Sequence, residues 1–221
     1  LQWADGSALQ FDGNVVYHPT VVNLVAVSTP SKLETMTGDF LDLHTQGQAK
    51  IEARIFYNEE IPKERGRTKV LTNVAIEGWG LEGQTFGTLT GPVEFSRNEL
   101  RLGPLKLSNG GGRALIQGHL RDTPLGSRLR LLANLDRLEM EAKSTTGGNS
   151  LFHGFVSGSA NLEGYTDFEK HPDGFLAGPL HLEVDTLTAF GIPYQSATVS
   201  AIYEGRVLDI RSFKARKGTG S

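Results

Sequence analysis

The chain has no cysteine among its 221 residues, which excludes disulfides, thiolate metal sites and cysteine nucleophiles together. No stretch approaches eighteen apolar residues, so the sequence given contains no transmembrane helix or signal peptide. Its 22 basic and 25 acidic residues are interspersed, without the basic cluster expected of a nucleic-acid-binding protein. We therefore expect no nucleic-acid partner. Because the sequence begins without Met, we interpret it as a piece of a larger protein.

Catalytic and cofactor motifs are also absent. The sequence has no G-x-S-x-G, H-E-x-x-H, Walker or dinucleotide-binding pattern. Of the six histidines, only His44, which follows Asp39 and Asp42, has a spacing conceivable for a metal site. On a strand, Asp39 would point to the face opposite the other two residues, so a solvated strand edge is the better interpretation. We expect no metal, no cofactor and no enzymatic activity.

What the sequence does contain is alternation of apolar and polar residues with a period of two, punctuated by 27 glycines. This pattern is typical of strands with one apolar and one wet face. No segment shows a 3.6-residue period over three turns; Ser31 to Met36, with Ser31 as an N-cap, would give one or two helical turns. We predict an all-β fold with antiparallel strands near 8–17, 20–27, 37–45, 48–57, 68–77, 84–95, 98–107, 113–120, 127–140, 151–163, 175–188, 196–204 and 206–216.

Two polar stretches interrupt this series, at 58–67 and at 143–150, and the second is where we place any internal boundary. A degenerate repeat runs through the strands. The segment 100–112 matches 208–220 position for position, and Leu89-Thr90-Gly91-Pro92-Val93-Glu94-Phe95 matches Leu176-Ala177-Gly178-Pro179-Leu180-His181-Leu182. A weaker third copy is Val156-Ser157-Gly158-Ser159-Ala160-Asn161-Leu162. Such repetition is typical of a sheet that grows by tandem addition of strands.

These repeats are similar to those of the AsmA-like/TamB superfamily of bacterial envelope proteins. The segment Phe155 to Gly164 resembles the family's G-x-a-x-l-x-G line, and 178–210 resembles its recurring order of G-x-l-x-l strand, g-x-p turn and long amphipathic strand. The resemblance is clearest over 84–221 and implies that 1–221 is one continuous segment of an elongated antiparallel sheet, folded into a U-shaped open groove (a β-taco) with an apolar interior. It further implies a periplasmic protein anchored in the inner membrane, which moves phospholipid towards the outer membrane.

Physical chemistry is compatible with such a groove. Exposing a sixteen-carbon acyl chain to water costs on the order of 12 kcal/mol, at about 0.8 kcal/mol per methylene, and an apolar groove removes most of this cost. A one-sided apolar sheet is otherwise the inner face of a closed sandwich or barrel, filled by its own side chains. The residues that we expect to line the groove are Val70, Val74, Ile76, Leu100, Leu102, Leu105, Leu107, Ala114, Ile116, Val199, Ala201, Leu208, Ile210 and Phe213.

Two functions follow from these expectations. The first is a passive groove that binds and conducts the acyl chains of phospholipid. The second is a structural module for outer-membrane protein assembly, which binds a partner protein by strand addition at an open sheet edge. Bound phospholipid would favour the first, and a specific protein partner with a dry interior would favour the second.

Overall fold

The computed structural model of the chain describes residues 8–17, 19–32, 45–63, 66–81, 84–143, 150–167, 170, 174, 176–189, 191–204 and 207–217. Of these described residues, 86% lie in strands and none lies in an α-helix. The all-β prediction is therefore confirmed. The alternation of apolar and polar residues explains why the chain forms strands, because residues with a period of two share one face only in an extended chain.

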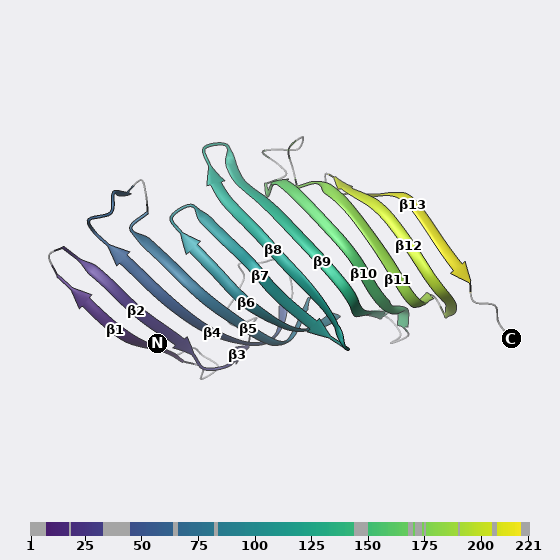
Figure 1. Ribbon diagram of the computed structural model, residues 1–221, viewed down its shortest axis with the longest axis horizontal. Helices are drawn as coiled ribbons and strands as arrows, with labels where there is room; N and C mark the ends of the chain where they lie inside the picture. The colour runs from purple at the N-terminus through teal and green to yellow at the C-terminus, as the bar shows by residue number, and fades with distance from the viewer. Residues whose placement is uncertain are drawn as a thin grey trace. The chain divides into compact units, whose positions relative to one another are not determined.

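The strands form one antiparallel sheet with the order β1-β2-β4-β5-β6-β7-β8-β9-β10-β11-β12-β13, while the short β3 pairs with β4 (Figure 1). Sequential strands are thus neighbours, as tight turns such as Arg97-Asn98 and Gly110-Gly111 require. The strand bounds are β1 Leu9–Val16, β2 Val21–Ser28, β3 Ser31–Lys32, β4 Thr45–Asn58, β5 Thr68–Leu81, β6 Gln84–Ser96, β7 Glu99–Asn109, β8 Gly112–Thr123, β9 Gly126–Lys143, β10 Ser150–Tyr165, β11 Gly178–Ala189, β12 Ile192–Glu204 and β13 Val207–Lys217.

Most predicted strands coincide with observed ones, and their ends differ by a few residues. The predicted helical turn is wrong at its start, because Ser31 and Lys32 form β3 and pair with Ala49 and Gln48. Pairing with the long strand β4 gives the backbone N–H and C=O groups of this segment hydrogen-bond partners. A single helical turn after the predicted N-cap would have paired fewer of them. The rest of that turn, and nearly all of the strand predicted at 37–45, lie outside the described residues.

The chain divides into two units, which we describe separately. Unit 1 comprises 1–105 and 119–122, and unit 2 comprises 106–118 and 123–221. The boundary that we predicted near 143–150 falls mainly on residues outside the described ranges and stays a prediction.

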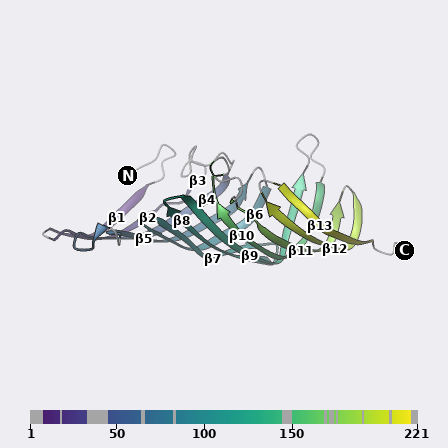
Figure 2. The same ribbon diagram turned by 90° about the horizontal axis from the view of Figure 1, so that it is seen from above.

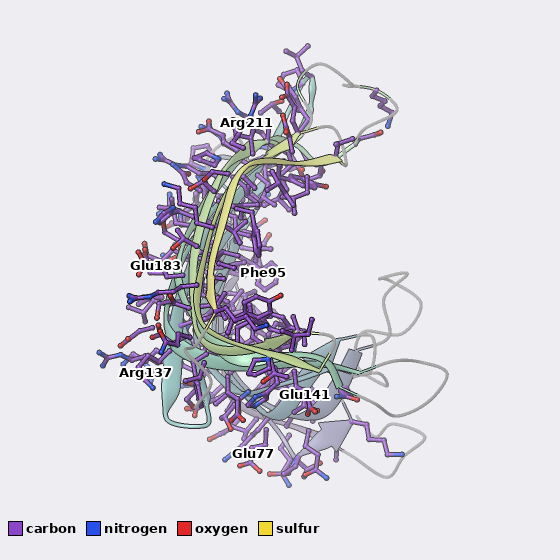
Figure 3. All side chains as sticks on the ribbon, turned by 90° about the vertical axis from the view of Figure 1, so that its right-hand side faces the viewer. Glu77, Phe95, Arg137, Glu141, Glu183 and Arg211 are labelled. Carbon is purple, nitrogen blue, oxygen red and sulfur yellow. The ribbon has the colours of Figure 1, made fainter. Side chains whose placement is uncertain are left out.

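The strands of unit 2 bend along their own length, so that their sheet has a concave and a convex side (Figures 2 and 3). Arg137, Glu183 and Arg211 lie on the convex side (Figure 3). Register places Val184, Ala197 and Phe213 on the opposite side from these charged residues. In unit 2 the apolar side chains therefore line the concave side of the sheet.

One glycine is shared by the three repeat copies and has the same backbone conformation in each. The φ angles of Gly91, Gly158 and Gly178 are 150°, 146° and 155°. A Cβ atom on any of them would collide with a carbonyl oxygen of a neighbouring strand, that of Pro104, His181 and Asn161 respectively. Only glycine accepts this combination of positive φ and close backbone approach. The repeat seen in the sequence thus marks a repeated structural position.

Candidate functional site

The candidate site is the set of side chains on one face of the sheet in each unit, called the apolar face below; the opposite face is called the polar face. In unit 1, Ile51 lies opposite Val74 across β4 and β5, and Ala49 lies opposite Ile76. On the other side of β5, Val70 lies opposite Phe95 and Ile76 lies opposite Leu89. The predicted lining residues Val70, Val74 and Ile76 therefore share one face with apolar side chains from both neighbouring strands.

Strand β7 carries four more predicted lining residues. Leu105 and Leu107 are 8% and 3% exposed, while the intervening Lys106 is exposed. Leu100 and Leu102 are half-buried, and Arg101 between them is exposed. Alternation alone would put Leu102 and Leu105 on opposite faces, so the burial pattern changes phase between them, at Gly103-Pro104. This is the position at which proline and glycine favour a bulge.

In unit 2 the predicted residues of β12 and β13 lie opposite one another. Val199 pairs with Phe213, Ala201 with Ile210, and Tyr203 with Leu208. Arg211 is an extra residue in this ladder, because the register shifts between Ser200 and Ala201. The bulge keeps Leu208, Ile210 and Phe213 on one face although their spacing is not uniformly two. On β8, Ala114 is 3% exposed and Ile116 is half-buried, between exposed Arg113, Leu115 and Gln117.

Exposure divides these residues into a covered set and an open set. Ile76, Leu105, Leu107, Ala114 and Ala201 are all less than 9% exposed, because neighbouring side chains shield them. Leu208, Ile210 and Phe213 are 52%, 56% and 61% exposed on the same face of unit 2 as Ala201. The remaining predicted residues are half-buried: Val70, Val74, Leu100, Leu102, Ile116 and Val199.

Our prediction missed the best-packed part of the apolar face of unit 2. Val156, Val184, Leu187 and Ala197 form a buried cluster there, flanked by Phe152, Met140 and Tyr194 among others. Alternation within 151–163 and 175–188 is a signal that could have identified Val156 and Val184. It could not have identified Leu187, because Thr186 has a φ of 50° and an irregularity in the pairing of β10 and β11 shifts the register beside it.

Two polar side chains on the apolar face of unit 1, those of Ser28 and Thr72, are buried. Ser28 is 2% exposed, and its Oγ accepts a hydrogen bond of 2.8 Å from the backbone N–H of Ile51. Thr72 is 8% exposed and sits between Ala53 and Val93 in the ladder. The hydrogen bond satisfies the buried hydroxyl of Ser28, so this face remains effectively apolar.

The polar face carries ion pairs instead. Lys69 pairs with Glu94 at 2.9 Å, and Arg113 pairs with Asp136 at 3.0 Å. Glu99 accepts hydrogen bonds from Arg101 and pairs with His119, and the Arg101 guanidinium is the main reason that the pKa of Glu99 lies below its ordinary value. These pairs are solvent-accessible and contribute little each, about 1 kcal/mol or less.

No group of three acidic or histidine side chains that would suit a metal ion occurs among the described residues. The candidate of Asp39, Asp42 and His44 lies outside them. Within the described ranges there is also no helix long and apolar enough to span a membrane.

The chain was compared with protein-family models, with curated proteins and with solved structures, and none of these comparisons gave a match.

Proposed function

We propose that the apolar face binds the acyl chains of phospholipid, and that the chain is a non-enzymatic segment of an envelope protein that conducts lipid between the inner and outer membranes. The resemblance of the repeats to the AsmA-like/TamB superfamily suggests the periplasm and an inner-membrane anchor. The apolar face supplies the chemistry for binding, since an acyl chain leaves water when it contacts Val, Leu, Ile and Phe side chains.

The observation that carries the proposal is that apolar side chains line the concave side of the sheet in unit 2, from Val184 and Ala197 to Phe213 (Figure 3). In a sandwich, these side chains would meet a second sheet about 10 Å away. Among the described residues every strand belongs to a single sheet and there is no helix to cover it. An exposed apolar patch of this kind is typical of a surface that has a ligand or partner.

Binding along such a face needs no catalytic group. The apolar side chains repeat from strand to strand with similar chemistry, so neighbouring positions bind an acyl chain with similar free energy. A lipid can then move from one position to the next without a deep trap, while its headgroup stays in water.

The test is photo-crosslinking with a phospholipid that carries a photoreactive group on one acyl chain. We expect modified peptides from the apolar face of β12 and β13, with Phe213 and Val199 among the labelled positions. Excess unlabelled phospholipid should remove the labelling, and glycerophosphocholine, which has the headgroup but no acyl chain, should not. Labelling confined to the polar face, or no bound lipid in native mass spectrometry, would contradict the proposal.

A further inference from the structure

Strand β12 has a tyrosine near each of its ends, and both lie on the apolar face of unit 2. Tyr194 packs against the buried cluster of that face, and Tyr203 lies opposite Leu208 on β13. At about 3.3 Å per residue, the strand between the two tyrosines extends for about 30 Å. Because the strands of unit 2 bend along their length (Figure 3), strand ends lie towards the borders of the concave side and strand middles lie at its floor.

The side chain of Tyr194 combines an apolar contact with a polar group that is available to a ligand. Its ring is half-buried against the cluster that contains Leu187 and Ala197. In the part of the chain that the structure describes, no group forms a hydrogen bond with its hydroxyl. Tyrosine is typical of the border between an apolar and a wet region, because the ring suits the first and the hydroxyl suits the second.

The two ends of β12 differ in charge. Lys217 on β13 lies directly opposite Tyr194 and is exposed, so an ammonium group shares the apolar face with this phenol. The only carboxylate of β12 is that of Glu204, at the other end of the strand and adjacent to Tyr203. On β11 the nearest carboxylate, that of Asp185, belongs to the polar face, since it lies opposite Ser196. The Tyr194 end of β12 therefore attracts an anion more strongly than the Tyr203 end.

Half-buried apolar residues give acyl chains a path across the strands beside this pair. One row of them crosses β9, β10, β11 and β12 in register, at Leu135, Gly158, Leu182 and Val199. The row is about 14 Å long, at about 4.8 Å between strands. Each of these residues is half-buried, so the row is open to a ligand along its length.

From this asymmetry we infer that Tyr194 and Lys217 bind the phosphate group of the phospholipid whose acyl chains lie on the apolar face. The inference rests on the function proposed above. The hydroxyl of Tyr194 and the ammonium group of Lys217 donate hydrogen bonds to phosphate oxygens, and hydrogen bonds between charged groups are stronger than neutral ones. The pair makes the apolar face selective for a phospholipid over an uncharged lipid with the same acyl chains.

The test compares two lipids with the same two octanoyl chains, phosphatidic acid and diacylglycerol, which differ only in the phosphate group. Isothermal titration calorimetry with the 221-residue chain should show that phosphatidic acid binds more tightly, by about tenfold or more. Tyr194→Phe and Lys217→Gln should each reduce this preference, and the double variant should abolish it. Binding of diacylglycerol should stay the same in all three. The preference should also fall as the salt concentration rises, because the charge of Lys217 is exposed.

Lys214→Gln is the matched control. It removes the same charge from the polar face of β13, opposite Thr198, and should leave the preference unchanged. Circular dichroism should show that every variant keeps the strand content of the unmodified chain.

The outcomes separate this inference from the proposed function. Equal binding of the two lipids by the unmodified chain would overturn the inference alone. So would a preference that survives in the double variant, or one that is lost in Tyr203→Phe, which removes the phenol at the other end of β12. Inorganic phosphate that displaces phosphatidic acid completely would show a site for free phosphate and would also overturn it. If neither lipid binds, the proposed function fails as well.

Discussion

Val199 on β12 lies directly opposite Phe213 on β13, and both side chains point to the apolar face. Val199 is half-buried, whereas Phe213 is 61% exposed because no further strand among the described residues lies beyond β13. The neighbouring position Ala201, also on the apolar face, is only 5% exposed. Three positions on one face thus sample an open, an intermediate and a closed environment.

A charge on this face should therefore have different effects at different positions. At Phe213 an introduced aspartate remains in water, so Phe213→Asp should fold with nearly unchanged melting temperature and lose phospholipid binding. At Ala201 the carboxylate would be desolvated at a cost of several kcal/mol, so Ala201→Asp should unfold the strand pair. Val199→Asp should fall between them. Thermal unfolding and native mass spectrometry with phospholipid measure both quantities.

Thr198→Asp is the control. It places the same charge at the residue before Val199, which lies on the polar face opposite Lys214. It should keep both stability and lipid binding. Unfolding of Phe213→Asp would show that the exposed side chain has a covering partner in solution. A folded Phe213→Asp variant that still binds lipid would remove this strand from the binding face.

The glycine position shared by the three repeat copies gives a prediction about stability. In Gly158→Ala, the new methyl group would overlap the carbonyl oxygen of His181 and lie 2.9 Å from the Cα of Leu182. The φ of 146° adds backbone strain. We expect a loss of at least about 2 kcal/mol in the free energy of unfolding, measured by denaturant titration. Ser159→Ala, next in the chain on the polar face, should change it by less than about 0.5 kcal/mol.

Much of the fold could be predicted because strand alternation is local. The alternation within each strand predicts which side chains share a face, and the repeat glycines mark where neighbouring strands approach closely. The bulges were harder to predict. Arg137 has a φ of 49°, and its backbone N–H donates to Ser157 Oγ on β10, so its conformation depends on a partner strand that no local pattern identifies.

Exposure could not be predicted either. In the repeat, Leu105 corresponds to Phe213, yet they are 8% and 61% exposed. The two sequences are alike, but within the part of the chain that the structure describes β7 has a strand on each side and β13 has one. The order of strands in the sheet therefore determines which predicted lining residues are open to a ligand. The repeat in the sequence does not show this order.

Ser28 gives a prediction for unit 1. Ser28→Ala would leave the backbone N–H of Ile51 without its acceptor beneath the apolar face, where Ser28 is 2% exposed. An unsatisfied buried donor costs about 1–3 kcal/mol, so the urea midpoint should fall accordingly. Asn23→Ala, an exposed position on the polar face of the same strand β2, should leave the midpoint nearly unchanged. Equal midpoints for Ser28→Ala and the unmodified chain would mean that water reaches this site.

The last prediction concerns pH and the polar face of unit 1. Hydrogen bonds, first from Arg101 and then from His119, hold the pKa of Glu99 below its ordinary value of 4.5. Because the folded pKa is the lower one, the stabilisation by Glu99 is complete above the ordinary pKa and is lost as pH falls through the folded pKa. Glu99→Gln should thus be less stable than the unmodified chain at about pH 7, by no more than about 1 kcal/mol since Arg101 is well exposed. The difference should shrink as pH falls below the ordinary pKa of 4.5 and vanish once the carboxyl group of the folded chain is protonated. Urea titrations across this range measure it, with Glu94→Gln, whose partner is Lys69, as the comparison for an ordinary surface pair. A difference that stays constant with pH would show that Glu99 acts by packing and that its charge contributes nothing.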